Sequence, residues 1–419
     1  MIFRILFLTA LILLIDYYVF QGIKFTFRTN SESAQKVVKL VYWSLTAICL
    51  SILISFSLYG FGSLPKFFRT YASAFVFVVM ISKLLIVIFL FTDDIGRGIR
   101  WVYEKISGSS NNGSVAALST NNSISRSDFI VKTGLLVSMV PFVSLIYGMV
   151  KGAYDYQVKN VKIKLPNLPD AFHGFRIIQI SDIHTGSFVT TDPLHEAVRL
   201  INEQKADMIL FTGDLVNNRS DELIPHKEVL SKLKAPHGVY SILGNHDYGD
   251  YVVWESEKAK RDNLQTLINS HREMGWDILL DEHREIEKNG EKISLIGVQN
   301  WSTHMRFPKY GSLKKATENI EYNSFNILMS HDPSHWHGEV LKDFPKVDLM
   351  LAGHTHGMQF GVELPFMKWS PVQYIYKEWA GLYEKGHQKL YVNRGLGFLG
   401  YPGRVGILPE ITVLELHKV

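Results

Sequence analysis

The sequence has a single cysteine among its 419 residues, Cys49, and this residue lies in an apolar run. One cysteine excludes an internal disulfide framework and a metal site built from several thiolates. The excess of positive charge is also small, because 44 lysines and arginines stand against 40 aspartates and glutamates and give a net charge of +4. An excess of this size does not favour nucleic acid as a partner, and we expect none.

Long apolar runs, in contrast, are frequent before residue 150. Four of them approach or exceed the roughly 20 residues that a helix needs to cross a membrane, namely Ile2 to Phe20, Val37 to Phe61, Tyr71 to Thr92 and Phe129 to Val150. We therefore predict an all-α bundle of four transmembrane helices over residues 1–150. The first run could instead be a signal peptide, but Asp16, Tyr17 and Tyr18 replace the small residues of a cleavage site. The Ser-, Asn- and Gly-rich segment 106–126 is predicted to be a loop.

Two charged side chains lie inside the predicted spans. Lys83 is near the middle of the third run, where an unpaired cation is costly, and Asp16 in the first run is one possible partner. We favour the alternative, in which Lys83 extends to the membrane interface and Asp16 lies at a helix end.

The lysines and arginines of the short loops predict the orientation of the spans. The loops after the first and third spans contain eight of them, which are Lys24, Arg28, Lys36, Lys39, Arg97, Arg100, Lys105 and Arg126. The opposite side would hold Arg4, Lys66 and Arg69. We therefore expect the C-terminal part on the extracytoplasmic side, although Lys151, Lys159, Lys162 and Lys164 reduce the contrast.

From about Tyr156 the pattern changes to short β-rich runs between polar or helical stretches, which is typical of an α/β domain. Five of these runs end in residues that can bind a metal. They are 176–180 before Asp182 and His184, 208–211 before Asp214, 239–243 before Asn245, His246 and Asp247, 326–329 before His331, and 347–351 before His354 and His356. Buried strands of an α/β sheet deliver such residues to a crevice at their carboxyl ends. The periodicity of 192–204 predicts a crossover helix, and hence parallel pairing of the first two strands.

These residue types suit a centre with two metal ions. Carboxylate, imidazole and amide groups bind divalent Mn, Fe, Zn or Co, and the sequence does not choose among them. A carboxylate can bridge two ions about 3.5 to 4 Å apart, and such a pair binds a phosphoryl oxygen and lowers the pKa of a bound water. Asp182 and His184 alone would more often be a strand-end cap and a surface histidine. The five motifs together predict a metal centre that hydrolyses a bond to phosphorus.

With these motifs the chain resembles the calcineurin-like metallophosphoesterase superfamily over roughly residues 172–416, and within it bacterial membrane-associated members of the YkuE and YaeI kind. The stretches HGFRIIQISDIH and NRGLGFLGYPGRVGILPEITVLEL share this resemblance. It implies a four-layer α-β-β-α sandwich over 172–419, with a linker and first strand at 151–171.

The resemblance also implies roles for the strand-end residues. One metal ion would be held by Asp182, His184, Asp214 and His356, and the other by Asp214, Asn245, His331 and His354. Asp214 would bridge the two ions. His246 would protonate the leaving oxygen or stabilise the transition state, and Asp247 would orient it. The alternative for His246 is a purely supporting hydrogen bond.

Two further positions bear on the site. Many relatives carry Gly-Asp-x-x-Asp, whereas this chain has Asn217 at the last position and so lacks that charge. We therefore expect a smaller loss of activity on substituting Asn217 than His246. Arg394 in the Gly-rich tail is a candidate for binding a substrate phosphate, although stabilisation of the loop is the role we favour for it and for Arg404.

The predicted function is a membrane-anchored phosphoesterase that hydrolyses a phosphodiester or a pyrophosphate. The membrane tether favours a lipid-linked substrate, and the related UDP-diacylglucosamine pyrophosphatases are one candidate, although they require a cytoplasmic site. Two alternatives come from other classes. One is a non-catalytic scaffold that keeps the fold, and the other is a membrane sensor or transporter, which would depend on Lys83 and Asp16 alone.

Overall fold

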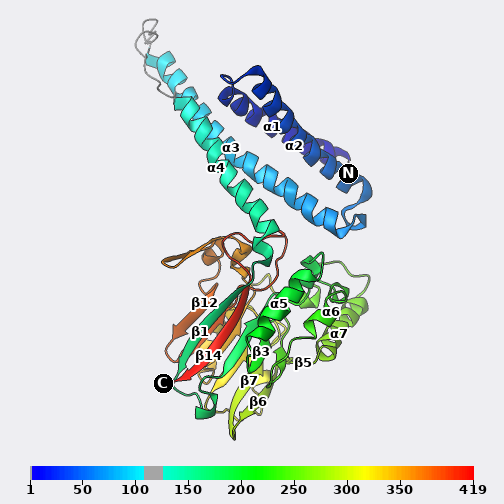
Figure 1. The fold of residues 1–419 in the computed structure, drawn as a ribbon, viewed down its shortest axis with the longest axis vertical. Coiled ribbons are helices and arrows are strands. Elements are labelled where there is room, and N and C mark those ends of the chain that lie inside the picture. Colours follow the sequence, from blue (N-terminus) through cyan, green and yellow to red (C-terminus); the bar gives the residue numbers. More distant parts are fainter. Residues whose placement is uncertain (1, 108–125) are drawn as a thin grey trace. The chain divides into compact units, whose positions relative to one another are not determined.

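The computed structural model describes residues 2–107 and 126–419, and the chain divides into two compact units between Ile146 and Tyr147 (Figure 1). The predicted loop at 106–126 lies almost wholly outside the described residues. The segment predicted to hold a linker and a first strand contains β1, which spans Gln157–Leu165.

The N-terminal part consists of four long helices: α1 (Ile2–Thr26), α2 (Glu32–Tyr59), α3 (Lys66–Ser107) and α4 (Arg126–Val150). All four are long and apolar enough to cross a membrane, which confirms the four predicted spans. The α2 helix begins at a serine cap, because the Ser31 hydroxyl accepts the N–H of Ala34. The first helix continues past the predicted end at Phe20 to Thr26.

The favoured prediction for Lys83 was wrong. Its Nζ atom lies 2.6 Å from Oδ1 of Asp16 and 3.2 Å from Oγ1 of Thr46, and both charged side chains are buried. Tyr42 donates its hydroxyl to the backbone oxygen of Asp16, a residue in the interior of α1. Because an apolar environment penalises an unpaired charge, pairing within the bundle replaces contact with the interface. The α1, α2 and α3 helices therefore meet at one polar cluster.

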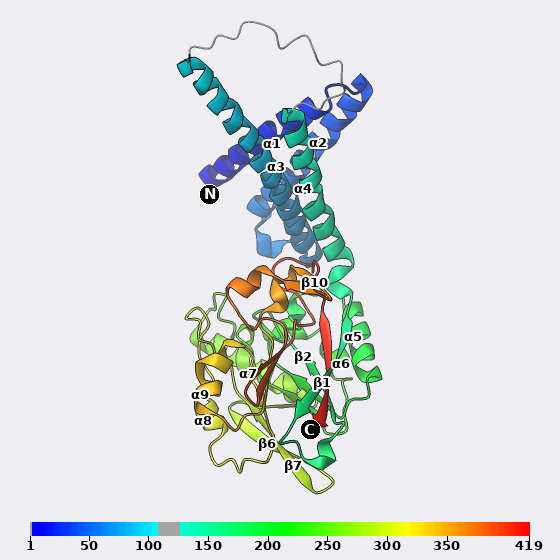
Figure 2. The same cartoon turned by 90° about the vertical axis from the view of Figure 1, so that its left-hand side faces the viewer.

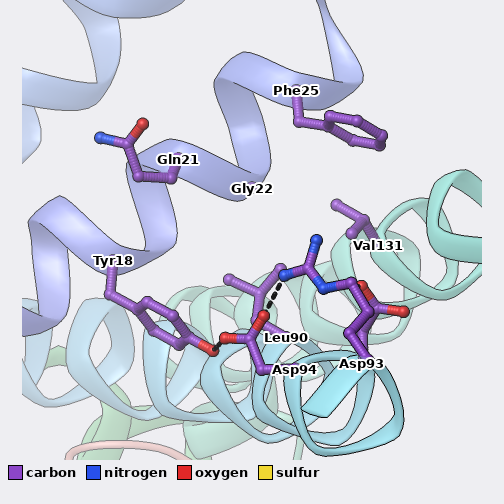
Figure 3. Close-up of a pocket in the computed structure, with 9 residues that line it drawn as sticks. Tyr18, Gln21, Gly22, Phe25, Leu90, Asp93, Asp94 and Val131 are labelled. Atoms are coloured by element: carbon purple, nitrogen blue, oxygen red, sulfur yellow. Dashed lines mark hydrogen bonds and ion pairs between the residues drawn. The ribbon is translucent and has the colours of Figure 1, made fainter. Parts of the chain in front are cut away.

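A second polar group lies beyond the apolar part of α3. A pocket of about 230 Å³ is lined by residues of α1, α3 and α4 (Figure 3). Tyr18 donates its hydroxyl to Asp94, and Arg97 pairs with the same carboxylate. These charges directly follow the run 71–92, so they mark the end of the predicted third span.

The C-terminal unit contains two six-stranded sheets. The first has the order β1-β14-β2-β3-β4-β5. Besides β1, its strands are β14 (Glu410–Lys418), β2 (Arg176–Ile180), β3 (Met208–Phe211), β4 (Val239–Ser241) and β5 (Trp276–Ile278). The strands from β2 to β5 are parallel, and β14 runs antiparallel to β2. The predicted crossover helix is α5 (Asp192–Glu203), which joins the parallel strands β2 and β3.

The second sheet has the order β12-β13-β9-β8-β7-β6. Its strands are β12 (Gly381–Lys385), β13 (Gln388–Val392), β9 (Leu349–Ala352), β8 (Asn326–Met329), β7 (Glu291–Gly297) and β6 (Glu282–Lys288). The four central strands are parallel, and β12 and β6 close the edges antiparallel to their neighbours. A separate hairpin is formed by β10 (Val362–Leu364) and β11 (Met367–Trp369).

The two sheets pack face to face, and helices cover their outer faces. Alternate residues of β2 show this arrangement, because Ile177 belongs to the apolar core between the sheets and Ile178 to the core beneath the outer helices. Strands buried on both faces need continuous apolar runs, which is the pattern in the sequence. The helices are α5, α6 (Lys227–Leu230) and α7 (Glu257–Glu273) on one side and α8 (Leu313–Ala316) and α9 (Leu341–Asp343) on the other. This confirms the predicted α-β-β-α sandwich (Figure 2).

Candidate metal centre

The five predicted strand-end motifs come together at the carboxyl ends of parallel strands from both sheets. Residues after β2, β3 and β4 come from the first sheet, and residues after β8 and β9 come from the second. Since parallel strands end at the same edge of a sheet, two facing sheets present their loops to one crevice. This is why residues from five separate segments can meet.

The chain takes unusual backbone conformations at this edge. Five of the seven predicted ligands have φ between 50° and 71°, namely Asp182, His184, Asp214, His354 and His356. The left-handed region costs a non-glycine residue about 1 kcal/mol or more. Such strain persists only where the surrounding structure holds it, and it concentrates at functional sites.

The side chains form two adjoining clusters. Asp182, His184 and His356 make up the first cluster, and Asp214, His331 and His354 make up the second. Within each cluster the potential ligand atoms all lie within 4.8 Å of one another. The Nε2 atoms of His184 and His356 are 3.0 Å apart, and Nε2 of His356 is 3.2 Å from Oδ1 of Asp182.

Asp214 links the two clusters. Its Oδ2 atom lies 3.1 Å from Nε2 of His331 and 3.6 Å from Nε2 of His184, which belong to different clusters. The predicted amide ligand Asn245 also reaches the centre, because its Oδ1 atom is 2.8 Å from Nδ1 of His354. Gly244 makes this approach possible, since a Cβ atom there would collide with the backbone nitrogen and carboxylate of Asp214.

Buried carboxylates and imidazoles shift one another's protonation. Burial alone would raise the pKa of Asp214, but the charges of His331 and His246 outweigh it and hold that pKa well below its usual range. Burial would lower the pKa of His331, and the Asp214 and Asp182 carboxylates instead raise it to about 10. Burial lowers the pKa of His354 to about 4, so its imidazole is neutral. The carboxylates therefore favour positive charge in this crevice, which divalent cations would supply.

Supporting hydrogen bonds orient two of the imidazoles. Nδ1 of His331 lies 2.7 Å from the backbone oxygen of Thr212, which fixes a proton on Nδ1 and turns Nε2 toward Oδ2 of Asp214, 3.1 Å away. His354 points Nε2 at the hydroxyl of Tyr376, 2.9 Å away, and that hydroxyl donates to Asp332. This relay escaped the sequence analysis. Asp332 directly follows His331 and could have been found, whereas Tyr376 carries no motif.

His246 lies beside the two clusters, but its partner differs from the predicted one. Its Nδ1 atom is 2.7 Å from the backbone oxygen of Asn217, which accepts the Nδ1 proton and so fixes the orientation of the ring. The Asn217 side chain hydrogen-bonds to Ser187 instead. The backbone oxygen of Asn217 thus orients His246, the role that was predicted for the carboxylate of Asp247.

The prediction that Asp247 orients His246 does not match the geometry. The Asp247 carboxylate accepts backbone N–H groups from Asp214, Leu215, Val216 and Gly244, at 2.8 to 3.2 Å. Burial and the Asp214 charge raise the pKa of Asp247 to about 7. Asp247 therefore holds the loop that carries Asp214, which makes it a positioning residue.

Arg394 is also placed differently from the predicted phosphate-binding role. Its guanidinium is buried and pairs with Glu410 and, at 2.7 Å, with Glu363. Arg404 is fully buried too and donates to the backbone oxygens of Arg394, Gly395 and Gly397. Both arginines hold the Gly-rich loop together, as the favoured alternative in the sequence analysis stated.

The clusters open into a cleft of about 210 Å³. Besides Asp214, Asn245, His246, His354 and His356, its lining includes His304, Arg306 and Phe307 from the loop after β7. Arg306 is exposed, and its guanidinium lies 4.6 Å from the centre of the Phe307 ring. Sequence reasoning missed Arg306, because no motif surrounds it and only the fold brings it to the cleft.

Comparison with known proteins agrees with this geometry. Residues 175–358 match the family model "Calcineurin-like phosphoesterase", and residues 2–153 match "Probable Calcineurin-like phosphoesterase, transmembrane domain". The chain is 34% identical over 284 residues to the metallophosphoesterase YkuE of Bacillus subtilis, a match covering 65% of this chain and 90% of that protein. The chain belongs to the calcineurin-like phosphoesterase family.

Two other relatives match about two thirds of this chain. The chain is 30% identical to a transmembrane protein with metallophosphoesterase domain from Danio rerio, over 68% of this chain and 62% of that protein. It is 26% identical to YkoQ of Bacillus subtilis, over 67% of this chain and 98% of that protein. Together with the four candidate spans, these matches make the chain a membrane-linked metallophosphoesterase.

Proposed function

We propose that the chain is a phosphoesterase with two divalent metal ions and hydrolyses a phosphodiester or a pyrophosphate. The observation that carries this proposal is the position of Asp214, whose carboxylate lies between one imidazole of each cluster. A shared carboxylate between two nitrogen-rich clusters is the arrangement that a pair of ions requires. Mn, Fe, Zn and Co all suit this donor set.

Asp182, His184, Asp214 and His356 would hold one ion, and Asp214, Asn245, His331 and His354 the other. Such ions supply Lewis acidity, which lowers the pKa of a bound water and polarises the phosphoryl group. The chain positions these ligands through backbone held at the strand ends and through the N–H groups that Asp247 gathers. His246, fixed by the Asn217 backbone oxygen, would give a proton to the leaving oxygen.

Arg306 would bind the anionic part of the substrate at the mouth of the cleft. We expect Arg306→Ala to raise KM about tenfold with little change in kcat, because it removes a contact made equally before and during reaction. The matched control is Lys309→Ala, which removes one positive charge from the same loop at a side chain that stacks on Trp301. Steady-state kinetics with a pyrophosphate substrate measure KM and kcat of the two variants. An equal rise in KM in both variants would contradict a specific contact between Arg306 and the substrate.

The catalytic unit would lie on the extracytoplasmic side and act on a lipid-linked substrate. The lysines and arginines of the loops after the first and third spans support this side. The four spans support a substrate near the membrane, because they keep the site close to it. A topology reporter fused after Val419 tests the orientation. Activity of a reporter that works only in the cytoplasm would place the catalytic unit on the cytoplasmic side instead.

The proposed function is tested with the purified full chain in detergent and Mn²⁺. We expect hydrolysis of bis-p-nitrophenyl phosphate or of a pyrophosphate, and loss of this activity on chelation. If the chain binds two metal ions but hydrolyses neither the diester nor any pyrophosphate tested, the result would favour the alternative of a non-catalytic scaffold. Binding without turnover is the outcome that separates the two classes.

A further inference from the structure

The β10–β11 hairpin is attached to the catalytic unit through its charged side chains. The register pairs Glu363 with Lys368 on one face and Leu364 with Met367 on the other. Glu363 accepts bonds from Arg394 at 2.7 Å and from Lys159 at 2.9 Å, and Lys368 donates to the backbone oxygen of Ala380. The charged face therefore attaches the hairpin to the catalytic unit.

The opposite face of the hairpin is apolar and exposed. We define the hairpin patch as Val362, Leu364, Phe366 and Met367, whose side chains are 38%, 45%, 85% and 45% exposed. Phe366 occupies the turn between the two strands. A hairpin on a water-facing surface normally places apolar residues inward and polar residues outward. Here the apolar side chains are as exposed as the charged ones, and an exposed apolar patch marks a site of contact with protein or membrane.

The hairpin patch lies close to the place where the chain leaves its last membrane helix. The N–H of Gly361, at the base of the hairpin, donates to Val405 at 2.9 Å. The N–H of the adjacent Arg404 donates to Gly148 in the last turn of α4 at 3.1 Å. A Cβ atom at Gly148 would lie 2.7 Å from the Val405 side chain, so glycine permits this approach. One loop thus separates the hairpin from the end of the fourth span, within the same compact unit (Figure 2).

The apolar surface also continues toward the cleft. Met358 and Ile375 line the cleft and are each about half exposed. Met358 stands four residues before the first residue of β10. Met358 thus connects the cleft mouth to the start of the hairpin along the chain.

We propose that the hairpin patch rests on the surface of the bilayer that holds the chain's own spans, with Phe366 among the lipid headgroups and upper acyl chains. Proximity to the end of α4 selects the bilayer over a soluble partner, since that end marks where hydrocarbon gives way to water. Aromatic and aliphatic side chains are the groups that partition into this interface. The contact does not depend on the proposed function, because it needs no catalysis.

The test uses the full chain in liposomes with one fluorophore per chain. Cys49→Ser removes the single cysteine, and Phe366→Cys introduces a site for an environment-sensitive label. The matched control is Glu287→Cys, an exposed position on the β6–β7 hairpin at the far end of the catalytic unit (Figure 1). Fluorescence is quenched either by lipids that carry bromine on the upper acyl chain or by aqueous iodide.

We expect bromolipids to quench the label at 366 at least threefold more strongly than the label at 287, and iodide to show the reverse order. Equal quenching by iodide at both positions would overturn the proposal. Protection of position 366 from both quenchers would also overturn it, because a protein partner or a second copy would then cover the patch. Liposomes with at most one chain each exclude the second copy. The quenching experiment does not depend on whether the chain hydrolyses a substrate. The membrane contact and the proposed function can therefore be disproved independently of each other.

Discussion

Asp214→Asn is expected to leave the chain folded but to reduce both bound metal and activity. The substitution keeps an oxygen that can accept the backbone N–H of His246, which now donates to Oδ1 at 2.8 Å. It removes the negative charge that lies between His184 and His331. Bound metal should fall from two ions per chain to one or fewer. The rate of diester hydrolysis should fall by about 10³-fold or more, the scale seen when one preorganised charge-stabilising group is lost.

The control for this variant is Asp277→Asn, which removes a carboxylate from a partly exposed ion pair with Arg284. Such pairs contribute little to stability, so metal content and rate should stay at the wild-type level. Elemental analysis by mass spectrometry and a diester assay on the same samples measure both quantities. Two bound ions together with a near wild-type rate in Asp214→Asn would end the account of a bridging carboxylate.

His246→Ala is expected to lower kcat by about 10² to 10⁴-fold on an alkyl ester while both metal ions stay bound. The backbone N–H that supports Asp214 is kept, so the ligand set remains in place. The loss should be much smaller on a p-nitrophenyl ester, because that leaving group needs no proton. A dependence on the leaving group separates a proton donor from a residue that only packs near the metals.

Asn217→Ala is the matched comparison for His246→Ala. It removes the hydrogen bonds between Asn217 and Ser187 but keeps the backbone oxygen that orients His246. We expect a loss of less than about tenfold in kcat. An equal loss in the two variants would show that the 217 side chain, and not the backbone, sets the geometry of His246.

The strand-end ligands could be predicted because each belongs to a local pattern. An apolar run that is buried on both faces must be a strand of a covered sheet, and polar residues directly after it must lie at that sheet's edge. This reasoning identified β2, β3, β4, β8 and β9 and brought Asp214 to the crevice. It did not separate the strands into two sheets. That division came from the family resemblance, since pairing between distant strands leaves no local pattern.

Other contacts could not be predicted because they depend on segments far apart in the sequence. Arg394 pairs with Glu363 across 31 residues. The pairing of Lys83 with Asp16 joins α3 to α1, and the sequence offered it only as one of two alternatives. Sequence adjacency was misleading for Asp247, whose carboxylate turns away from the neighbouring His246 toward the β3 loop. Side-chain direction at a tight turn is set by the local backbone, which the order of residues does not reveal.

The separation in sequence between the residues of the first cluster also determines when this cluster can form during synthesis and folding. His184 and His356 stand 172 residues apart in the chain, yet their imidazoles meet. A nascent chain that has not yet produced the segment after β9 therefore lacks a complete first cluster. A metal ion held by the complete cluster would therefore bind only after His356 has reached His184. A bound ion would then close a very long loop, at an entropic cost that grows only slowly with loop length, and would join the two sheets at the end of folding.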